Sequence, residues 1–351
     1  MKIKTLIKSS TGLSLGLLLS GSVLADSVMR VASWLPPTHP QNAIVLTTWG
    51  KWIDEATQGR VKMKIEYGMG HPKTMFDLVE DNVVDASWSV HGYIPGRFKL
   101  TESVELPNLN ANAEAASVAF WRVSNKYYKQ ANEHEGLVVA ALFTHGPGQI
   151  HLAEPIDSLA DMKNRKIRLG GGIQTQLGER MGVTAVGAPA PKVYEMMQQG
   201  VVDGVFIPTG EQKTLRLNEV TKQLVLLPGG MYVMSFSIFM NPDFLDGLSK
   251  EDKAAILAVS GEKLSALAGR AWDGGDAQGL VTAKNAGVSI LEVKKGDLID
   301  KEFQAMIIGM DEDYLKRVSN RDVDAAAALK ELRETARNYV PESAQAKTAQ
   351  N

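Results

Sequence analysis

The hydrophobic and polar positions near the start of the chain predict a strand, a helix and a second strand. Residues 28–33 read as a strand, and the proline-rich run WLPPTHP ends it. Apolar residues between positions 45 and 56 recur at helical spacing, and those between 61 and 67 alternate strictly with lysine and glutamate. This order is typical of an α/β sheet, so the pattern predicts an α/β fold.

Two later segments repeat one pattern. PKTMFDLVEDNVVDAS begins at residue 72, and PKVYEMMQQGVVDGV begins at residue 191. In each, Pro-Lys opens a helix, and Val-Val-Asp followed by a small residue enters a strand. Asn82 and Gly200 stand where the helix ends in a left-handed residue, and Asp85 and Asp203 occupy equivalent strand starts. The repeats lie too far apart for a solenoid. We interpret them as two similar lobes, with chance similarity of two ordinary turns as the alternative.

The remaining patterns predict how the lobes are connected. Residues 136–143 read as a buried strand, and THGPGQIHL after them as a glycine and proline crossing that acts as a hinge. Residues 235–241 read as a strand that returns to the first lobe. A helix capped by Ser249 is expected to run toward Ala286, long enough to lie across both lobes. A strand VSILEV and two helices up to Tyr339 follow.

These elements predict a discontinuous division of the chain. Residues 26–145 and 233–272 are assigned to lobe I, and residues 146–232 and 273–340 to lobe II. Residues 341–351, PESAQAKTAQN, are expected to form a disordered tail.

The first 25 residues read as a secretory signal peptide. Three lysines precede an apolar run that ends in VLA, which fits the small-residue rule for cleavage. The run is short for a bilayer and interrupted by serine and glycine, which disfavours the alternative, a membrane anchor. Cleavage would remove the three lysines and change the formal net charge from −2 to −5. This mild acidity argues against nucleic acid as a partner, and we expect a soluble protein outside the cytoplasm.

The sequence lacks the common motifs that indicate an enzyme. It has no cysteine, so a thiol nucleophile and a thiolate metal site are excluded. The metallopeptidase, P-loop and nucleophile-elbow motifs are absent. The triple glycine at 170–172 lacks the third glycine of the dinucleotide pattern, because Thr175 stands in its place. The six histidines have no metal-ligand spacing. We expect no catalysis, no cofactor and no metal.

Arg168 is the candidate binding residue that the sequence singles out. It lies between the apolar Ile167 and Leu169, just before the triple glycine. A buried guanidinium must be paired, because an uncompensated interior charge is costly. A carboxylate accepts its N–H groups bidentately. The glycines are expected to let a ligand approach the backbone at a helix N-terminus. An internal salt bridge to an Asp or Glu is the alternative.

Four blocks of the chain resemble one transporter family. They are VVDASWSVHGYIPGRFKLTESVELPNL, IDSLADMKNRKIRLGGGIQTQLGERMGVTAV, PAPKVYEMMQQGVVDGVFIP and FMNPDFLDGLSKEDKAAIL. In order and spacing they resemble the substrate-binding proteins of tripartite ATP-independent periplasmic (TRAP) transporters, the DctP-type receptors. The resemblance implies a two-lobed periplasmic-binding-protein fold with a hinge and a long helix spanning both lobes.

The same resemblance implies a function without catalysis. In this family the arginine of the KIRL strand, here Arg168, forms a salt bridge to a carboxylate of the ligand. The loaded receptor is periplasmic and delivers its ligand to the TRAP membrane permease subunits, which use an ion gradient.

Several positions depart from the sugar-acid and dicarboxylate members of the family. A second arginine often stands where this chain has Gly148 and Gln149, and an asparagine is common where Phe206 and Ile207 stand. Trp34 lies near a position that is often small and polar. These differences remove hydrogen-bond donors and add apolar surface. We therefore expect a small organic acid, a monocarboxylate rather than a C4-dicarboxylate.

The matched blocks imply further pocket residues. Four follow the first repeat, at the sheet edge where open α/β sheets bind ligands, and each is equally open to a core or rim role: Trp88, Ser89, His91 and Tyr93. Others face the cleft if the family alignment holds: Trp34, Gln149, Gln174, Pro208 and Phe236. Arg97 is expected to be structural, capping a carbonyl or pairing with Glu102 or Glu105.

Two other functions remain open from the sequence. A secreted α/β enzyme would use His91 or His145 as general base and Arg168 as anion clamp. Neither histidine is accompanied by a nucleophile elbow, a cofactor fingerprint or a carboxylate pair, which disfavours the enzyme. A ligand-sensing partner of a membrane signalling protein would use the same fold and pocket as a transport receptor.

Overall fold

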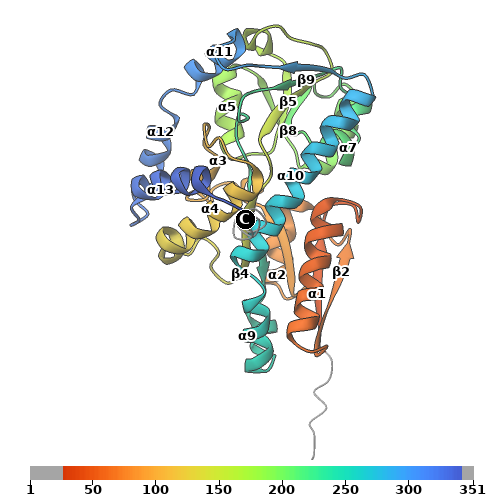
Figure 1. Ribbon diagram of the computed structural model, residues 1–351, viewed down its shortest axis with the longest axis vertical. Helices are drawn as coiled ribbons and strands as arrows, with labels where there is room; N and C mark the ends of the chain where they lie inside the picture. Colours follow the sequence, from red (N-terminus) through yellow and green to blue (C-terminus); the bar gives the residue numbers. More distant parts are fainter. Residues whose placement is uncertain (1–26, 342–351) are drawn as a thin grey trace, which may run out of the picture.

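The strands of the protein form two separate sheets (Figure 1). The computed structural model describes residues 27–341, so the predicted signal peptide and residues 342–351 of the predicted tail lie outside the described residues. The five-stranded sheet has the order β2-β1-β3-β10-β4, and the six-stranded sheet has the order β11-β9-β5-β8-β6-β7. Below, lobe I means the five-stranded sheet with the segments that join its strands, and lobe II means the same for the six-stranded sheet. The two-lobed α/β fold is confirmed, and the exact lobe boundaries stay a prediction.

The bounds of the strands follow the chain. In lobe I they are β1 (Ser27–Ser33), β2 (Val61–Tyr67), β3 (Ala86–Val90), β4 (Val138–Thr144) and β10 (Ser235–Met240). In lobe II they are β5 (Gly148–Leu152), β6 (Lys166–Leu169), β7 (Thr184–Gly187), β8 (Gly204–Pro208), β9 (Gln223–Leu226) and β11 (Ser289–Glu292).

Helices connect and cover these strands. Before β10 they are α1 (Thr47–Ala56), α2 (Met75–Glu80), α3 (Glu102–Glu105), α4 (Ala113–Val123), α5 (Ile173–Met181), α6 (Val193–Gln198) and α7 (Glu211–Thr214). After β10 they are α8 (Pro242–Asp246), α9 (Lys250–Ala258), α10 (Glu262–Asn285), α11 (Leu298–Met306), α12 (Met310–Arg317) and α13 (Ala325–Asn338). The apolar face predicted for α1 is buried at Trp49 and Ile53.

The two repeated segments play the same part in the two sheets. One forms α2 and β3, the other α6 and β8, and the left-handed residues predicted at both helix ends are confirmed. The carboxylate of Asp85 accepts the backbone N–H of Arg30 in β1 at 2.7 Å. The carboxylate of Asp203 accepts the backbone N–H of Lys166 in β6, also at 2.7 Å. Each aspartate thus ties its own strand to a parallel neighbour, which supports one plan for both lobes rather than chance similarity.

The chain crosses between the lobes after β4 and again after β9. Residues 145–147 make the first crossing, and β10 then returns to lobe I, where it pairs antiparallel with β3 and β4. The predicted crossing over all of THGPGQIHL is wrong for its second half. Gly148–Leu152 forms β5, because its backbone pairs antiparallel with both β8 and β9.

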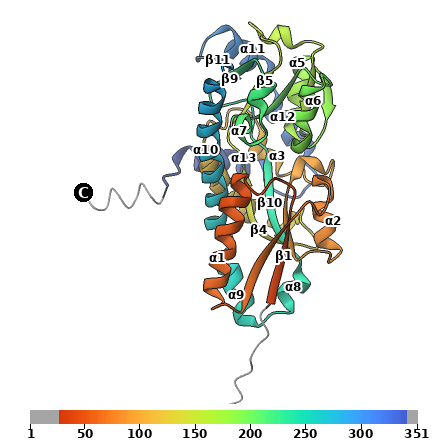
Figure 2. The same ribbon diagram turned by 90° about the vertical axis from the view of Figure 1, so that its right-hand side faces the viewer.

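The long helix predicted from Ser249 toward Ala286 is two helices. Gly261 separates α9 from α10, with φ +77° and its N–H bonded to the carbonyl of Ala140 in β4 at 2.6 Å. In a continuous helix this N–H would donate to a carbonyl four residues earlier, so its bond to β4 marks the break between the two helices. α10 packs against α4 and β4 in lobe I and against α7 and β11 in lobe II, so it spans both lobes by itself (Figure 2).

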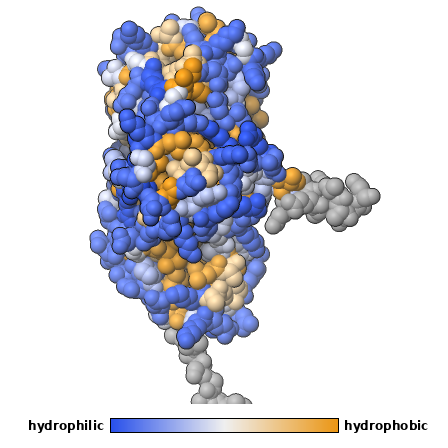
Figure 3. All heavy atoms as spheres, turned by 90° about the vertical axis from the view of Figure 1, so that its left-hand side faces the viewer, coloured by the Kyte–Doolittle hydropathy of each residue, from blue (hydrophilic) through white to orange (hydrophobic). Residues whose placement is uncertain are grey.

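The C-terminal region holds three helices where the sequence predicted two. Gly309 adopts φ +83° between α11 and α12, and α13 follows. The surface on this side is mostly hydrophilic, with separate hydrophobic patches (Figure 3). Within residues 27–341, no helix is both long and apolar enough to cross a membrane.

Candidate ligand-binding site

Arg168 lies on β6 with only 2% of its surface exposed. Its Nε donates to the carbonyl of Ala188 at 2.7 Å, and its Nη2 lies 3.4 Å from the hydroxyl oxygen of Tyr93. No Asp or Glu of residues 27–341 forms an ion pair with it, so the internal salt bridge considered above is not seen. A buried guanidinium with only neutral partners is costly, and it favours an anion beside it.

The Arg168 side chain faces a cavity of about 30 Å³ that residues of both lobes line. A cavity of this volume admits water but not an aromatic acid, so a ligand of that size enters only when the lobes or the lining side chains move apart. Six of the residues predicted to contact the ligand line it: Trp34, Tyr93, Arg168, Gln174, Pro208 and Phe236.

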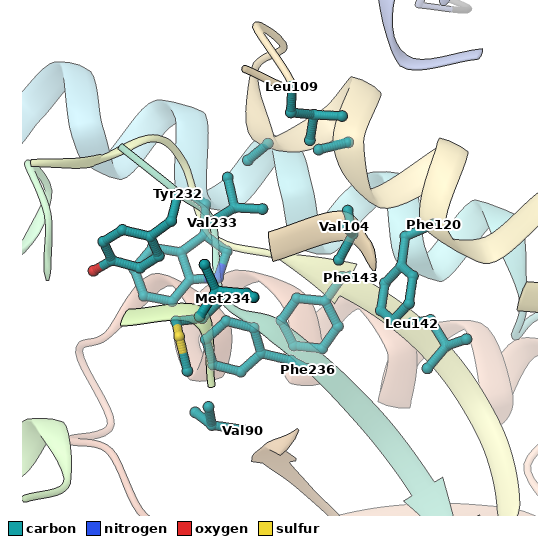
Figure 4. Close-up of a cluster of buried hydrophobic side chains, with 14 of the residues drawn as sticks. Val90, Val104, Leu109, Phe120, Leu142, Phe143, Tyr232, Val233, Met234 and Phe236 are labelled. Atoms are coloured by element: carbon teal, nitrogen blue, oxygen red, sulfur yellow. The ribbon is translucent and has the colours of Figure 1, made fainter. Parts of the chain in front are cut away.

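Aromatic rings form one wall of the cavity. The ring centroid of Trp34 lies 4.6 Å from that of Trp88 and 5.9 Å from that of Tyr93. Phe236 stacks on Phe143 with centroids 5.0 Å apart, and Figure 4 shows this pair beside Met234. Such a wall offers flat apolar surface to a ligand ring.

Several polar groups at the cavity have hydrogens without an acceptor. The Tyr232 hydroxyl and the Trp272 indole N–H are buried and make no hydrogen bond with the described residues. The Tyr93 hydroxyl accepts a backbone N–H at 2.9 Å and faces Arg168, so its own proton remains available. Burial raises the pKa of both tyrosines, which keeps them protonated. The Gln174 side chain accepts a backbone N–H through Oε1 and leaves its Nε2 group to donate. These donors suit a carboxylate.

Four of the predicted residues do not line this cavity: Trp88, Ser89, His91 and Gln149. Trp88 lies behind Trp34, and its indole N–H donates to the Ser33 hydroxyl at 3.0 Å. The Ser89 hydroxyl donates to the carbonyl of Pro72 at 2.9 Å, next to α2. Gln149 bonds through its side chain to the backbone just after β9, where it joins β5 to that strand. These side chains therefore support the site from behind.

The two histidines considered as general bases have both ring nitrogens engaged. His145 lines the cavity, but its Nδ1 donates to the carbonyl of the next residue and its Nε2 accepts the backbone N–H of Met234 at 3.2 Å. Burial lowers the pKa of His145 to about 4, so the ring is neutral. His91 contacts the hydroxyls of Ser235 and Ser237 at 3.0 and 3.1 Å. Neither ring offers the free nitrogen that the enzyme hypothesis requires.

The triple glycine before α5 brings the two lobes together. A Cβ on Gly171 would lie 2.2 Å from the carbonyl oxygen of Gly92 in lobe I, and one on Gly172 would lie 2.3 Å from Glu105 Oε2. Gly170 alone of the three lines the cavity. The prediction that these glycines make room for the ligand is therefore wrong for Gly171 and Gly172, because the backbone and carboxylate of lobe I occupy that space.

The N-terminus of α5 is also occupied by the protein itself. Glu105 accepts the N–H of Ile173 at 3.2 Å through one oxygen, and through the other it accepts the N–H and the hydroxyl of Ser235 at 3.0 and 2.6 Å. Burial raises the pKa of Glu105 to about 7. The helix end predicted to attract an anionic ligand thus holds an internal carboxyl group.

Arg97 has the structural role that the sequence predicted, with a different partner. Its Nη2 pairs with Glu80 at 2.5 Å, not with Glu102 or Glu105, and its guanidinium lies 5.1 Å from the ring centres of both Phe76 and Phe98. The residue belongs to the packing of lobe I beneath α2.

The sequence analysis did not predict four residues that line the cavity. They come from the segment between β9 and β10 (residues 227–234), from α7 and from α10. Tyr232 and Met234 precede Phe236 with a period of two, which was a usable signal because alternate residues of an extended segment share one side. Glu211 and Trp272 also line the cavity. No local pattern marks them, since their place depends on how α7 and α10 pack across the lobes.

Comparison with known proteins agrees with this architecture. The family model described as bacterial extracellular solute-binding protein, family 7 (DctP), matches residues 31–316. The chain belongs to this family. A TRAP periplasmic solute-binding protein from Bordetella bronchiseptica, solved with bound (R)- and (S)-mandelate, is 32% identical with a TM-score of 0.85, covering 88% of this chain and 98% of that one. The protein is thus a TRAP transporter substrate-binding protein, as the resemblance of the four blocks implied.

Two further relatives are similar over most of their length. A marine metagenome TRAP solute-binding protein, described as specific for aromatic acid ligands and solved with 3-hydroxybenzoate, is 32% identical with a TM-score of 0.83, covering 90% of this chain and 100% of that one. The outer membrane transporter protein TsaT of Comamonas testosteroni is 29% identical over 307 residues, which are 87% of this chain and 90% of TsaT.

Proposed function

We propose that this TRAP receptor binds a small aromatic monocarboxylate, holds its carboxylate on Arg168 and delivers it from the periplasm to the TRAP permease. The observation that carries the proposal is the buried Arg168 guanidinium, which has only neutral partners in a cavity walled by Trp34, Tyr93 and Phe236. A carboxylate would neutralise it bidentately, and a ring would cover the aromatic wall.

The relatives support the same ligand class. The Bordetella bronchiseptica protein was solved with mandelate and the metagenome protein with 3-hydroxybenzoate, each a single aromatic ring with one carboxylate. The cavity adds its own reason. It has a single arginine among its lining residues, so a second carboxylate would find no matching cation there.

A ligand panel tests this function. The mature chain, refolded to remove carried-over ligand, would be titrated with benzoate, mandelate, phenylacetate, succinate and glucuronate by thermal shift and calorimetry. A bound acid at a hundred to a thousand times its Kd should stabilise the protein by about 3 to 4 kcal/mol. We expect the aromatic monocarboxylates to shift the midpoint and the other acids to have little effect. A shift with succinate or glucuronate alone would overturn the assignment of ligand class.

Arg168→Ala tests the role of the guanidinium. Removing one member of a buried charge pair costs about 2 to 5 kcal/mol, so affinity for the same acid should fall by about thirtyfold to several thousandfold. Arg168→Lys should also weaken binding, because the charge remains but the bidentate geometry is lost. Arg122→Ala, a half-exposed arginine paired with Glu262, is the control and should bind normally. Unchanged affinity in Arg168→Ala would sink the assignment.

Delivery is tested separately in cells that carry the permease subunits. Uptake of the labelled acid should require the receptor and should be lost with Arg168→Ala. Tight binding without receptor-dependent uptake would instead favour a ligand-sensing role for the protein.

A further inference from the structure

Glu211 is a buried acid at the cavity, and the proposed carboxylate site does not use it. It stands at the start of α7, is 2% exposed and lines the cavity. One oxygen, Oε2, accepts the hydroxyl of Thr214. Glu211 forms no ion pair with Arg168, so the cavity contains an arginine and a glutamate that do not neutralise each other.

The other oxygen of Glu211, Oε1, accepts no hydrogen bond from the described residues. Nε2 of His39 lies 3.5 Å from it, and this nitrogen makes no hydrogen bond with the described residues. His39 accepts the backbone N–H of Gln41 through Nδ1 at 3.2 Å. A carboxylate oxygen that faces a closed cavity without a donor favours a ligand that brings one.

An unused donor lies at the same end of the cavity. The ring of Trp272 packs edge-on against His39 with centroids 5.1 Å apart, which places it beside the same imidazole that Glu211 faces. Its indole N–H is buried and has no partner among the described residues. This end of the cavity thus presents one unsatisfied acceptor and one unsatisfied donor.

We propose that Glu211 and Trp272 form a hydroxyl-recognition subsite, and that the ligand is an aromatic monocarboxylate with a hydroxyl group away from the carboxylate. The hydroxyl donates to Glu211 Oε1 and accepts from Trp272 Nε1, and so satisfies both groups. An aromatic amino group would serve Glu211 but would serve Trp272 poorly, because its nitrogen lone pair is delocalised into the ring and accepts weakly from the indole N–H. An unsubstituted ring would leave both groups desolvated and unpaired, which sites of this kind reject strongly. The inference rests on the proposed function and specifies its substrate class.

Matched ligands test the subsite in the unmodified protein. Affinities would be measured by calorimetry for benzoate and phenylacetate, their hydroxy derivatives at each ring position, and the corresponding methoxy and amino compounds. At one ring position we expect the hydroxy acid to bind at least tenfold tighter than the unsubstituted acid. The methoxy compound should lose this gain because it cannot donate to Glu211. An unsubstituted acid that binds as tightly as every hydroxy acid overturns the inference, and so does an amino compound that exceeds its hydroxy counterpart.

Variants assign the preference to the two residues. Glu211→Met keeps the length of the side chain and removes the acceptor, so the hydroxy-to-unsubstituted affinity ratio should fall to about one while the unsubstituted acid still binds. Glu211→Gln, which keeps an acceptor oxygen, should retain part of the ratio, and Trp272→Phe should reduce it. Glu219→Gln, an exposed glutamate paired with Arg216, is the control and should leave the ratio intact. A full ratio in Glu211→Met overturns the inference.

The outcomes separate this inference from the proposed function. If no aromatic acid binds, or if Arg168→Ala binds them normally, the proposed function fails. If the acids bind through Arg168 without preference for a hydroxyl, only the subsite fails. Should Glu211→Met not fold, the ligand series in the unmodified protein still decides.

Discussion

Lobe I lines the cavity with Trp34, Tyr93 and Phe236, whereas lobe II contributes Arg168 and Glu211. The first set continues the packing of its own lobe, since Trp34 lies on Trp88 and Phe236 on Phe143. The second set stands on the ends of β6 and α7 and has few internal partners. One wall therefore supplies apolar area that also stabilises the fold, and the other supplies charges that a ligand must satisfy.

This difference predicts different results of substitution in the two walls. Changes to the aromatic wall should alter stability and affinity together, because the same rings are buried in lobe I. Changes to the charged groups of lobe II should lower affinity and selectivity without lowering stability, because a buried charge without an ion-pair partner costs folding free energy and does not stabilise the fold.

Glu105 is a charged residue whose titration should change folding stability rather than affinity. This is the largest effect that we expect. This buried carboxyl group joins the backbone of α5 in lobe II to Ser235 of lobe I. Burial raises its pKa from 4.5 to about 7, so between these pH values the folded state holds a proton that the unfolded state has lost. Folding stability contributed by this group therefore falls as pH rises from about 4.5 to about 7, by on the order of 3 kcal/mol.

The comparison with Glu105→Gln isolates this titration. Other buried groups, such as Asp276 with its raised pKa and His145 with its lowered pKa, titrate alike in both proteins and cancel. Urea unfolding at several pH values should show the unmodified protein losing stability relative to the variant as pH rises through this window. A constant difference across the window would show that Glu105 does not titrate there.

The contact between Gly171 of lobe II and Gly92 of lobe I gives the next effect. Gly171→Ala places a methyl group 2.2 Å from the Gly92 carbonyl oxygen at φ +92°, so the lobes cannot approach as closely. We expect affinity for the preferred acid to fall by about tenfold or more. The radius of gyration measured by small-angle scattering should increase, because the lobes stay further apart. Gly187→Ala, which has open space around its Cβ and an ordinary φ, is the control. Equal affinity in the two variants would mean that this contact does not govern closure.

The sequence carried enough information for the fold and for part of this site. The repeat around Asp85 and Asp203 predicted two lobes on one plan, and the apolar neighbours of Arg168 predicted its burial, because both signals are local in the chain. The roles of Gly171 and Glu211 could not be predicted in the same way. Each depends on a partner in a distant segment, and local periodicity does not report such contacts.

Trp34 offers the smallest effect and the sharpest test of the aromatic wall. Its ring is partly exposed, packs at a tilt against Trp88 and lies edge-on to Tyr93, and its indole N–H donates to the backbone of β3 at 2.9 Å. Trp34→Phe keeps an aromatic face and loses the hydrogen bond, so we expect a change of about 1 kcal/mol in unfolding free energy. Affinity for an aromatic acid should fall less than threefold, because a ring still covers the ligand.

Trp34→Ala removes the face as well, and aromatic pairs are worth about 0.5 to 1.5 kcal/mol beyond the area that they bury. Affinity for the aromatic acid should then fall by roughly tenfold, while a small aliphatic monocarboxylate, held by Arg168 alone, should bind Trp34→Ala and the unmodified protein almost equally. Calorimetry with both ligands measures this directly. If both acids lose affinity to the same extent, Trp34 acts through the structure of lobe I, and the aromatic wall does not select the ligand.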